Sequence, residues 1–267
     1  MTAGQECVVG VAAPAAPVYD KTVKRRADQL LVERGLAPSR TRAQSLLLAG
    51  KVYSGEIRIE KAGQLLAVDA PLTIREGDRF VSRGGHKLEG ALDALAIDVA
   101  GLTAVDVGAS TGGFTDCLLQ RGARHVFAVD VGRGQLAQKL RQDNRVTCME
   151  GVNARYLQSD DFDRTIELIV VDASFIGLEK LIPAMTRILV PNGCLLAMVK
   201  PQFEVGREQA RRFRGVVRDP ELRDAAIQNV RAALVSHEFL LHGECASVLP
   251  GPRGNIEHFL YAQRQDP

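Results

Sequence analysis

Two charged residues stand at the ends of apolar runs that have the length and composition of buried strands. Lys200 follows CLLAMV, and Asp172 follows LIVV. A lysine is rarely buried without a partner, so Lys200 either escapes to solvent or is held in place for chemistry. Because the carboxyl ends of strands in an open α/β sheet face the ligand crevice, we expect both side chains to project into one crevice, where they could move or orient a proton.

Two further charged residues flank the same predicted sheet. Lys87, in SRGGHKLEG, precedes the first strand, and Glu257, in GNIEHFLYA, opens the last one. Each also has an ordinary interpretation, Lys87 as a surface helix residue and Glu257 as a charge that protects an edge strand from aggregation. Asp172 could likewise be a helix cap. Taken singly, these residues leave both interpretations open.

The stretch DVGASTGGFTD joins the first strand of this region to its first helix and is a candidate cofactor loop. It lacks the lysine of a phosphate-binding P-loop, and Gly108, Gly112 and Gly113 fit the dinucleotide-binding spacing G-x-G-x-x-G badly. S-adenosylmethionine (SAM) fits better, because its methyltransferases typically place an acid two residues before the first glycine, here Asp106. SAM carries a sulfonium and an ammonium but no phosphate, so nearby carboxylates suit it. A tight turn without a ligand is the alternative.

Asp130 closes the second strand, in FAVDVG, and lies 22 residues after Gly108. We expect its carboxylate to accept hydrogen bonds from the ribose hydroxyls of the cofactor. Acids at or next to the ends of three strands favour a cofactor site over an empty turn. The predicted cofactor-binding residues are Asp106, Gly108, Ala109, Ser110, Gly112, Gly113, Phe114, Asp130, Val131 and Asp172.

Strands and helices alternate in the part of the chain that carries these residues. Apolar runs and helical periodicity predict strands at 103–108, 125–130, 146–150, 167–172, 194–200, 239–248 and 256–262, and helices at 113–121, 135–141, 178–189 and 220–236. Buried parallel strands interleaved with helices indicate a doubly wound α/β sheet, a Rossmann-like fold of the SAM-dependent methyltransferase type. The last two strands, joined by LPGPRGN, predict a hairpin, so we expect seven mostly parallel strands with an antiparallel last strand.

A smaller α+β unit precedes this sheet. We expect helices at 27–34 and 39–49, each ended by a glycine, and short strands at 52–53, 57–59 and 72–74. The stretch RADQLLVERGLAPSRTRAQSLLLAGKVY resembles the S4 RNA-binding domain, with a small helical appendage of no particular function as the alternative. The resemblance implies contacts to RNA phosphates, which position RNA without reading its sequence, by Arg25, Arg26, Arg40, Arg42 and Lys51.

The net charge of +2 is small but unevenly distributed. Residues 21–51 carry +6 and residues 207–218 carry +4, so the rest of the chain is acidic. Clustered cations on an acidic chain are typical of proteins that bind a phosphate backbone, although a charge run is more often only a solvated face. We therefore add to the candidate RNA contacts Arg83, Arg211, Arg212 and Arg214.

Five motifs together resemble one known family. SRGGHKL, DVGASTGGFTD, VDASFIGL, VKPQFEVG and GPRGNIEHF are similar, in order and spacing, to the TlyA family of ribosomal RNA 2′-O-methyltransferases, which joins an S4 domain to an FtsJ-like methyltransferase domain. The resemblance implies a catalytic tetrad of Lys87, Asp172, Lys200 and Glu257. It also implies SAM-dependent methylation of a ribose 2′-hydroxyl, of a cytidine, in large-subunit ribosomal RNA, with the small subunit left open.

The implied chemistry gives each member of the tetrad a role. A 2′-hydroxyl must lose its proton as it attacks the methyl carbon in line with the sulfonium. We assign Lys200 to take or orient that proton, because partial burial and the neighbouring cation Lys87 can lower the pKa of a lysine. Asp172 and Glu257 position the two amines. Because coupled groups do not titrate singly, the division of roles between the lysines stays open.

The resemblance also implies the domain boundaries. We expect an S4-like domain at 23–76, a linker at 77–83 and the methyltransferase domain at 84–267. DRFV, at 78–81, corresponds to the interdomain linker of the family, where we expect a hinge that adjusts when RNA binds. Residues 1–22 are additional to the family pattern, and we expect a disordered, dispensable leader.

Composition limits the remaining classes. No apolar run approaches the 18 residues of a membrane helix, the five cysteines form no CxxC pair, and the five histidines form no ligand-spaced cluster. We therefore expect a cytoplasmic protein without a metal. We also expect a monomer, and the resemblance implies ribosomal RNA within ribosomal subunits as its partner. Two other functions stay open, a non-catalytic S4-type RNA-binding ribosome factor and a membrane-active haemolysin, a label that some relatives carry.

Overall fold

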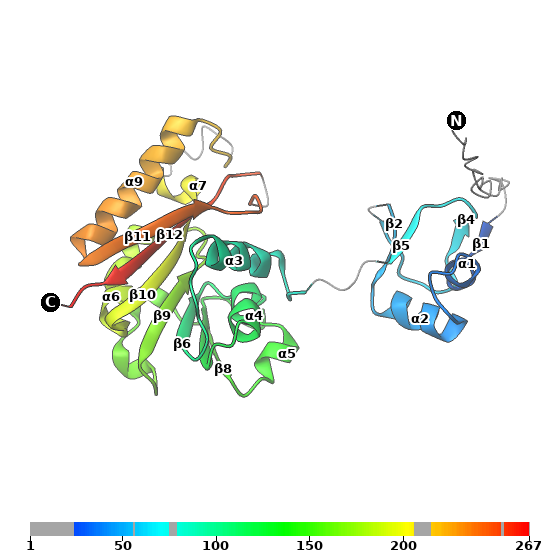
Figure 1. The fold of residues 1–267 in the computed structure, drawn as a ribbon, viewed down its shortest axis with the longest axis horizontal. Coiled ribbons are helices and arrows are strands. Elements are labelled where there is room, and N and C mark those ends of the chain that lie inside the picture. The colour runs from blue at the N-terminus through cyan, green and yellow to red at the C-terminus, as the bar shows by residue number, and fades with distance from the viewer. Residues whose placement is uncertain (1–23, 56, 75–78, 206–214, 252–253, 267) are drawn as a thin grey trace, which may run out of the picture. The chain divides into compact units, whose positions relative to one another are not determined.

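The computed structural model describes residues 24–55, 57–74, 79–205, 215–251 and 254–266. It divides into two compact units, one ending at Arg79 and one beginning at Phe80, and each is described by itself (Figure 1). The predicted leader at 1–22 lies outside the described residues. Within the described ranges, no helix has the length and apolar character needed to cross a membrane.

The N-terminal unit contains two short helices and two small sheets (Figure 1). Its elements are β1 (Lys24–Arg26), α1 (Ala27–Glu33), α2 (Arg40–Leu48), β2 (Val52–Ser54), β3 (Ile57–Arg58), β4 (Leu65–Ala67) and β5 (Leu72–Ile74). β3, β2 and β5 form one antiparallel sheet, and β1 pairs with β4. Both expected helices are present. β1 and β4 were not predicted, because three residues are too few to show an alternating pattern.

Capping residues set the ends of the two helices. The Ser39 hydroxyl accepts a hydrogen bond from the backbone N–H of Arg42 at 3.2 Å and so satisfies a free donor of the first turn of α2. Gly35 and Gly50 follow the two helices with a φ of +69° each, a conformation that glycine adopts without a steric penalty. The apolar faces of the helices then pack into one core around Leu30, Leu31 and Leu47.

The C-terminal unit is built on one seven-stranded sheet in the order β11-β12-β10-β9-β6-β7-β8. The strands are β6 (Thr103–Val107), β7 (His125–Asp130), β8 (Val146–Glu150), β9 (Ile166–Val171), β10 (Leu189–Val199), β11 (Phe239–Ala246) and β12 (His258–Arg264). β12 runs antiparallel to both neighbours, and the other pairs are parallel. The predicted mostly parallel sheet with an antiparallel last strand is confirmed.

Helices cover both faces of this sheet (Figure 1). They are α3 (Arg83–Ala94), α4 (Gly113–Gln120), α5 (Gln138–Arg141), α6 (Ile182–Ile188), α7 (Pro201–Glu204) and α9 (Pro220–Ser236), with 3₁₀ turns at Ala154–Tyr156, Ser159–Asp161 and Leu178–Lys180. One buried cluster joins α6 and α9 to one face of the sheet, and a second joins α3, α4 and α5 to the other. Successive residues of β6 alternate between these clusters, as a strand buried on both faces requires.

The predicted linker at 77–83 is too long at its C-terminal end. Phe80 is only 2% exposed and belongs to the core of the second unit, and Arg83 is already the first residue of α3. The sequence analysis missed this helix, because its first turn carries the two glycines of SRGGHKLEG. Residues 75–78 lie outside the described residues, so the hinge stays a prediction.

The segment directly after Lys200 is the short helix α7, formed by Pro201–Glu204. Proline suits the first position of a helix, because the N–H that it lacks has no intrahelical acceptor there. The chain therefore leaves β10 through a defined turn.

α3 and α4 approach closely at Gly113, and we predict that Gly113→Ala destabilises this unit. An added Cβ at Gly113 would lie 2.9 Å from the backbone nitrogen of Gly85 and 2.2 Å from Ser82 Oγ, so the two helices must separate. Such overpacking costs about 1–3 kcal/mol in the free energy of unfolding, measurable by urea denaturation.

Gly84→Ala is the matched control. Its added Cβ would meet its nearest atom, Ser82 Oγ, at 3.4 Å, which is an ordinary contact, and a Gly→Ala change within a helix is neutral or slightly stabilising. Equal stability of the two variants would contradict the close approach at Gly113.

Candidate active site

The candidate residues lie at the carboxyl ends of four neighbouring strands. Lys200 follows β10 and Asp172 follows β9, while Asp106 lies in β6 and Asp130 ends β7. These strands are adjacent in the order β10-β9-β6-β7, and all run in the same direction. The parallel sheet therefore gathers these charges along one edge.

Lys200 is held at this edge by three oxygen atoms. Its Nζ lies 2.5 Å from Asp172 Oδ1, 2.8 Å from Ser174 Oγ and 3.3 Å from the Asp172 carbonyl oxygen. The last two contacts are hydrogen bonds, and the contact with Asp172 Oδ1 is an ion pair. Only 10% of the Lys200 side chain is exposed. The lysine is thus neither free in solvent nor buried without a partner.

A second buried ion pair joins Lys87 to Glu257. Lys87 comes from α3 and Glu257 immediately precedes β12, and their side chains are 8% and 1% exposed. Burial raises the pKa of Asp172; Lys200 and, less strongly, Lys87 oppose this rise, and Glu257 adds to it. Both pairs therefore act on the Asp172 carboxylate, and the four residues of the predicted tetrad form two ion pairs.

The glycine-rich turn lies beside these pairs. Gly108 has a φ of +85°, and an added Cβ there would come within 2.8 Å of the Asp172 carbonyl oxygen. Only glycine therefore fits where the turn passes the end of β9. Ser110, also at positive φ (48°), donates its backbone N–H to Asp130 Oδ2 at 2.8 Å. The turn is thus fixed to both neighbouring strand ends.

Asp106 is completely buried below this turn. Its Oδ2 accepts hydrogen bonds from the backbone N–H and the hydroxyl of Thr115, at 2.9 and 2.6 Å. Its Oδ1 is buried without a hydrogen-bond partner among the described residues. Burial raises the pKa of Asp106 to about 7, repulsion from Asp172 and Asp130 adds to this rise, and the Thr115 bonds oppose it. An unsatisfied carboxylate oxygen at this depth is suited to a cationic ligand group.

The other predicted cofactor residues differ in accessibility. Val131 is 70% exposed next to Asp130, whereas the side chain of Phe114 is only 2% exposed. The Phe114 ring stacks on Phe259 within the core, with centroids 6.1 Å apart. Phe114 is therefore a packing residue, and its side chain is not available to a ligand at the surface. The sequence could not separate these roles, because it shows only an apolar residue in the first turn of a helix.

An exposed aromatic residue that the sequence analysis missed stands next to the tetrad. Phe175 is 90% exposed and has a φ of +67°, which is unusual for a bulky residue. Its ring lies 5.3 Å, between centroids, from that of Phe203 in α7. Phe175 lies three positions after Asp172 in the sequence. A large apolar ring held in solvent beside buried charges is suited to contact a flat ligand.

Two further carboxylates fix the loops around this edge. Glu204 in α7 accepts a hydrogen bond from the backbone N–H of Leu178 at 3.0 Å, and burial raises its pKa to about 7. This bond joins α7 to the loop that carries Phe175. At the end of β8, Glu150 accepts from the backbone N–H groups of residues 134–136 and from Arg141, and these bonds lower its pKa to about 2. Glu150 thereby fixes the loop after Asp130.

The predicted RNA contacts fall into three groups. In the N-terminal unit, Arg25 pairs with Glu33 at 3.0 Å, Arg26 and Arg40 both contact Asp28, Arg42 is exposed and Lys51 is half-buried. In the second unit, Arg83 donates to the Pro250 carbonyl at 3.1 Å. Arg211, Arg212 and Arg214 lie outside the described residues.

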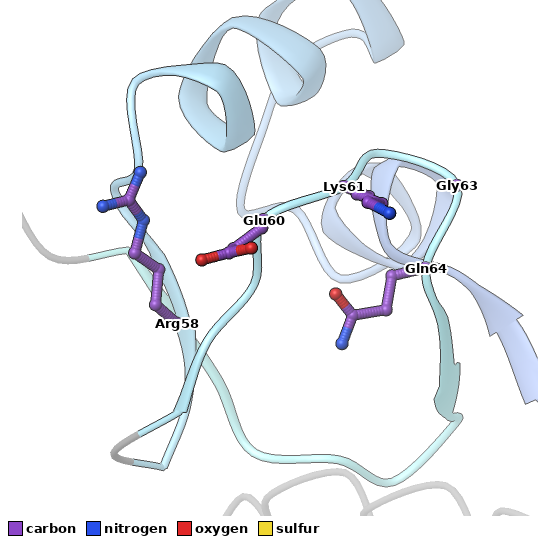
Figure 2. Close-up of a pocket in the computed structure, with 5 residues that line it drawn as sticks. All are labelled: Arg58, Glu60, Lys61, Gly63 and Gln64. Carbon is purple, nitrogen blue, oxygen red and sulfur yellow. The ribbon is translucent and has the colours of Figure 1, made fainter.

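The N-terminal unit also has an open hollow of about 680 Å³ (Figure 2). Its lining residues are Arg58, Glu60, Lys61, Gly63 and Gln64. Figure 2 shows Arg58 on one side of the hollow and Gln64 on the other. Two of the five residues are cationic, which suits a polar, anionic ligand better than an apolar one.

Fold and site together define a class of enzyme. A seven-stranded sheet with an antiparallel last strand, and with a glycine-rich turn and acids at its carboxyl edge, is that of the SAM-dependent methyltransferases. Residues 80–264 match the model of the FtsJ-like methyltransferase family, and residues 25–70 match that of the S4 domain. The chain therefore belongs to the FtsJ-like methyltransferase family and carries an S4 domain.

Individual relatives confirm the resemblance to the TlyA family. The chain is 45% identical over 244 residues, 91% of each protein, to the 16S/23S rRNA (cytidine-2′-O)-methyltransferase TlyA of Mycobacterium tuberculosis. It is 32% identical over 182 residues to the 23S rRNA (cytidine-2′-O)-methyltransferase TlyA of Campylobacter jejuni, covering 68% of this chain and 70% of that one. A solved Streptococcus thermophilus structure that carries a hemolysin name is 41% identical, with a TM-score of 0.70 over 91% of this chain and 89% of the other.

The raised pKa of Asp106 leads to a prediction about stability. The folded protein holds this proton more tightly than the unfolded chain does, so the associated stabilisation is complete below a pH of about 4 and is lost as pH rises through about 7. The unaltered protein should therefore lose stability as pH rises over this range, whereas Asp106→Asn should not lose this contribution. We expect the difference between their free energies of unfolding, variant minus unaltered protein, to grow by about 4 kcal/mol. Urea denaturation at several pH values measures it.

The subtraction supplies its own control, because every other titrating group is present in both proteins. A difference that stays constant with pH would show that Asp106 ionises as freely in the folded protein as in the unfolded chain.

Proposed function

We propose that this chain transfers a methyl group from SAM to the ribose 2′-hydroxyl of a cytidine in ribosomal RNA. The observation that carries the proposal is the set of two buried ion pairs, Lys87–Glu257 and Asp172–Lys200, beside the glycine-rich turn. Burying four charges is costly, and a site that only bound RNA would have no need of it. The names of the two TlyA relatives share the cytidine 2′-hydroxyl as target.

Both of those names also include 23S ribosomal RNA, and 16S occurs only in the M. tuberculosis name. We therefore propose large-subunit RNA as the main substrate. Mass-spectrometric mapping of ribose methylation in both subunits of a deletion strain tests this choice. Loss of no methyl group in either subunit would refute the proposed function.

Three features of the chain fit the cofactor. Asp106 Oδ1 has no hydrogen-bond partner among the described residues and suits the ammonium group of SAM. The turn from Gly108 to Gly113 leaves its backbone close to the strand ends, where the methionine part would lie. Asp130 already orders this turn through Ser110 and suits the ribose hydroxyls. When bound, SAM supplies the electrophilic methyl group.

The tetrad handles the proton that the 2′-hydroxyl must lose. Lys200 orients the hydroxyl and takes its proton, and Asp172 and Ser174 fix the position of Nζ. Lys87 supplies a second positive charge to the site. Glu257 fixes Lys87. Holding the reacting atoms in line contributes to the rate in addition to the proton transfer.

Lys200→Ala tests this assignment. We expect methyl transfer to fall by about 10²- to 10⁴-fold, the usual contribution of a general base, in an assay of tritiated methyl groups on ribosomal subunits. The control is Lys180→Ala, which removes a nearby lysine that is exposed. Activity of Lys200→Ala near that of the control would remove the base assignment.

Phe175 is proposed to stack on a base of the substrate next to the methylated ribose. Its exposed ring, braced by Phe203, offers a platform at the tetrad. Stacking is worth about 1–3 kcal/mol per base, so we expect Phe175→Ala to lower kcat/KM for RNA by roughly 5- to 150-fold, and Phe175→Tyr to retain most activity. Calorimetry should show unchanged affinity for SAM.

Tyr156→Ala is the control for this prediction, because Tyr156 is also exposed, at 67%, and lies in the same unit. Equal effects of Phe175→Ala and Tyr156→Ala would show that Phe175 has no particular contact with RNA.

A further inference from the structure

Asp28 lies in the first turn of α1, and its carboxylate is fully buried. Arg26 donates to it through Nε at 3.0 Å and Nη2 at 3.2 Å, Arg40 through Nη2 at 3.1 Å, and Gln44 through Nε2 at 3.0 Å. These bonds, led by that from Arg26, hold the pKa of Asp28 well below its usual range. The carboxylate therefore stays ionised and binds two arginines.

The two guanidinium groups are held side by side. Both donate to the same oxygen, Asp28 Oδ2. Their side chains are nevertheless 43% and 55% exposed, for Arg26 and Arg40. A guanidinium has five N–H donors, and Asp28 takes two from Arg26 and one from Arg40. Both groups thus present further donors outward from a fixed position.

Gly63 leaves room for this arrangement. An added Cβ there would lie 3.2 Å from Arg26 Nη1, so the guanidinium rests against the bare backbone. Gly63 also lines the hollow of Figure 2, whose wall contains Arg58 and Lys61. Arg26 therefore lies next to this hollow, where two further cationic side chains are found.

We propose that Asp28 is a positioning residue that orders Arg26 and Arg40 as a binding site for one phosphate of the RNA backbone. This inference rests on the proposed function, because it takes RNA as the ligand of this unit. Two guanidinium groups held on one carboxylate can both donate to the oxygens of one phosphate, and an arginine fixed in advance loses less side-chain freedom when the phosphate binds. The negative charge of Asp28 acts in the opposite sense, since it repels the phosphate.

The opposing effects make the proposal testable with Asp28→Asn and Glu33→Gln. Each variant removes one negative charge beside an arginine, but Glu33 pairs with Arg25 at a site where its side chain is 45% exposed. If charge alone mattered, both variants would bind RNA more tightly. If Asp28 orders the arginines, Asp28→Asn weakens binding by roughly tenfold while Glu33→Gln does not.

A second pair of variants applies if Asp28→Asn unfolds the N-terminal unit, which thermal unfolding would reveal. Arg40→Lys keeps the positive charge, but an ammonium lacks the planar guanidinium that can donate to Asp28 and to a phosphate at the same time. We therefore expect it to weaken binding by about five- to tenfold. Arg124→Lys, at an exposed position of the C-terminal unit outside the predicted RNA contacts, should have no effect. Because no charge is lost, the salt dependence of binding should be the same for both variants.

The measurement is the Kd of the full-length chain for transcribed large-subunit ribosomal RNA, by filter binding at several salt concentrations, together with kcat and KM for methyl transfer. We expect Asp28→Asn and Arg40→Lys to raise Kd and KM and to leave kcat at saturating RNA unchanged. Arg40→Lys equal to Arg124→Lys, or a folded Asp28→Asn no weaker than Glu33→Gln, would overturn this inference alone. An unaltered chain that binds no ribosomal RNA would overturn the proposed function and this inference with it.

Discussion

The pairing of four largely buried charges governs the candidate site of the C-terminal unit. Lys87, Asp172, Lys200 and Glu257 come from four separate parts of the chain, and each is largely withdrawn from water. A buried charge that loses its partner is strongly destabilising, so α3, β9, β10 and the start of β12 must meet within ion-pair distance. The same requirement sets the position of the reactive amines, because a lysine held between fixed acceptors cannot sample other rotamers.

Close backbone approach complements this electrostatic constraint. Gly108 lets the turn pass the end of β9, and Gly113 lets α4 lie against the start of α3, which carries Lys87. Side chains at these positions would separate elements that bear the tetrad. Asp106 is buried beneath the turn, so its ionisation destabilises the protein when no ligand is bound. A cationic ligand group would offset that cost, which couples cofactor binding to the ionisation of one carboxylate.

The N-terminal unit applies the same principle to a different task. Asp28 is as completely buried as Asp106, yet the two carboxylates differ in their partners. Two arginines and an amide surround Asp28 and lower its pKa, whereas Asp106 has one hydroxyl and one N–H and its pKa is raised. Burial alone therefore does not decide the state of an acid; the donors that reach it do.

The sequence by itself determined the fold class and the order of most strands and helices, and its resemblance to a known family supplied the four residues of the predicted tetrad. Apolar runs, helix caps and glycine turns are local signals, and the charged residues of the motifs stand directly at the strand ends or beside them. Only the tertiary structure decided which charges pair, since Lys87 and Glu257 are 170 positions apart. It also decided that Phe114 is buried and Phe175 exposed, and that Asp28 lies beneath two arginines. Exposure and pairing depend on how distant segments pack, and no local pattern records that packing.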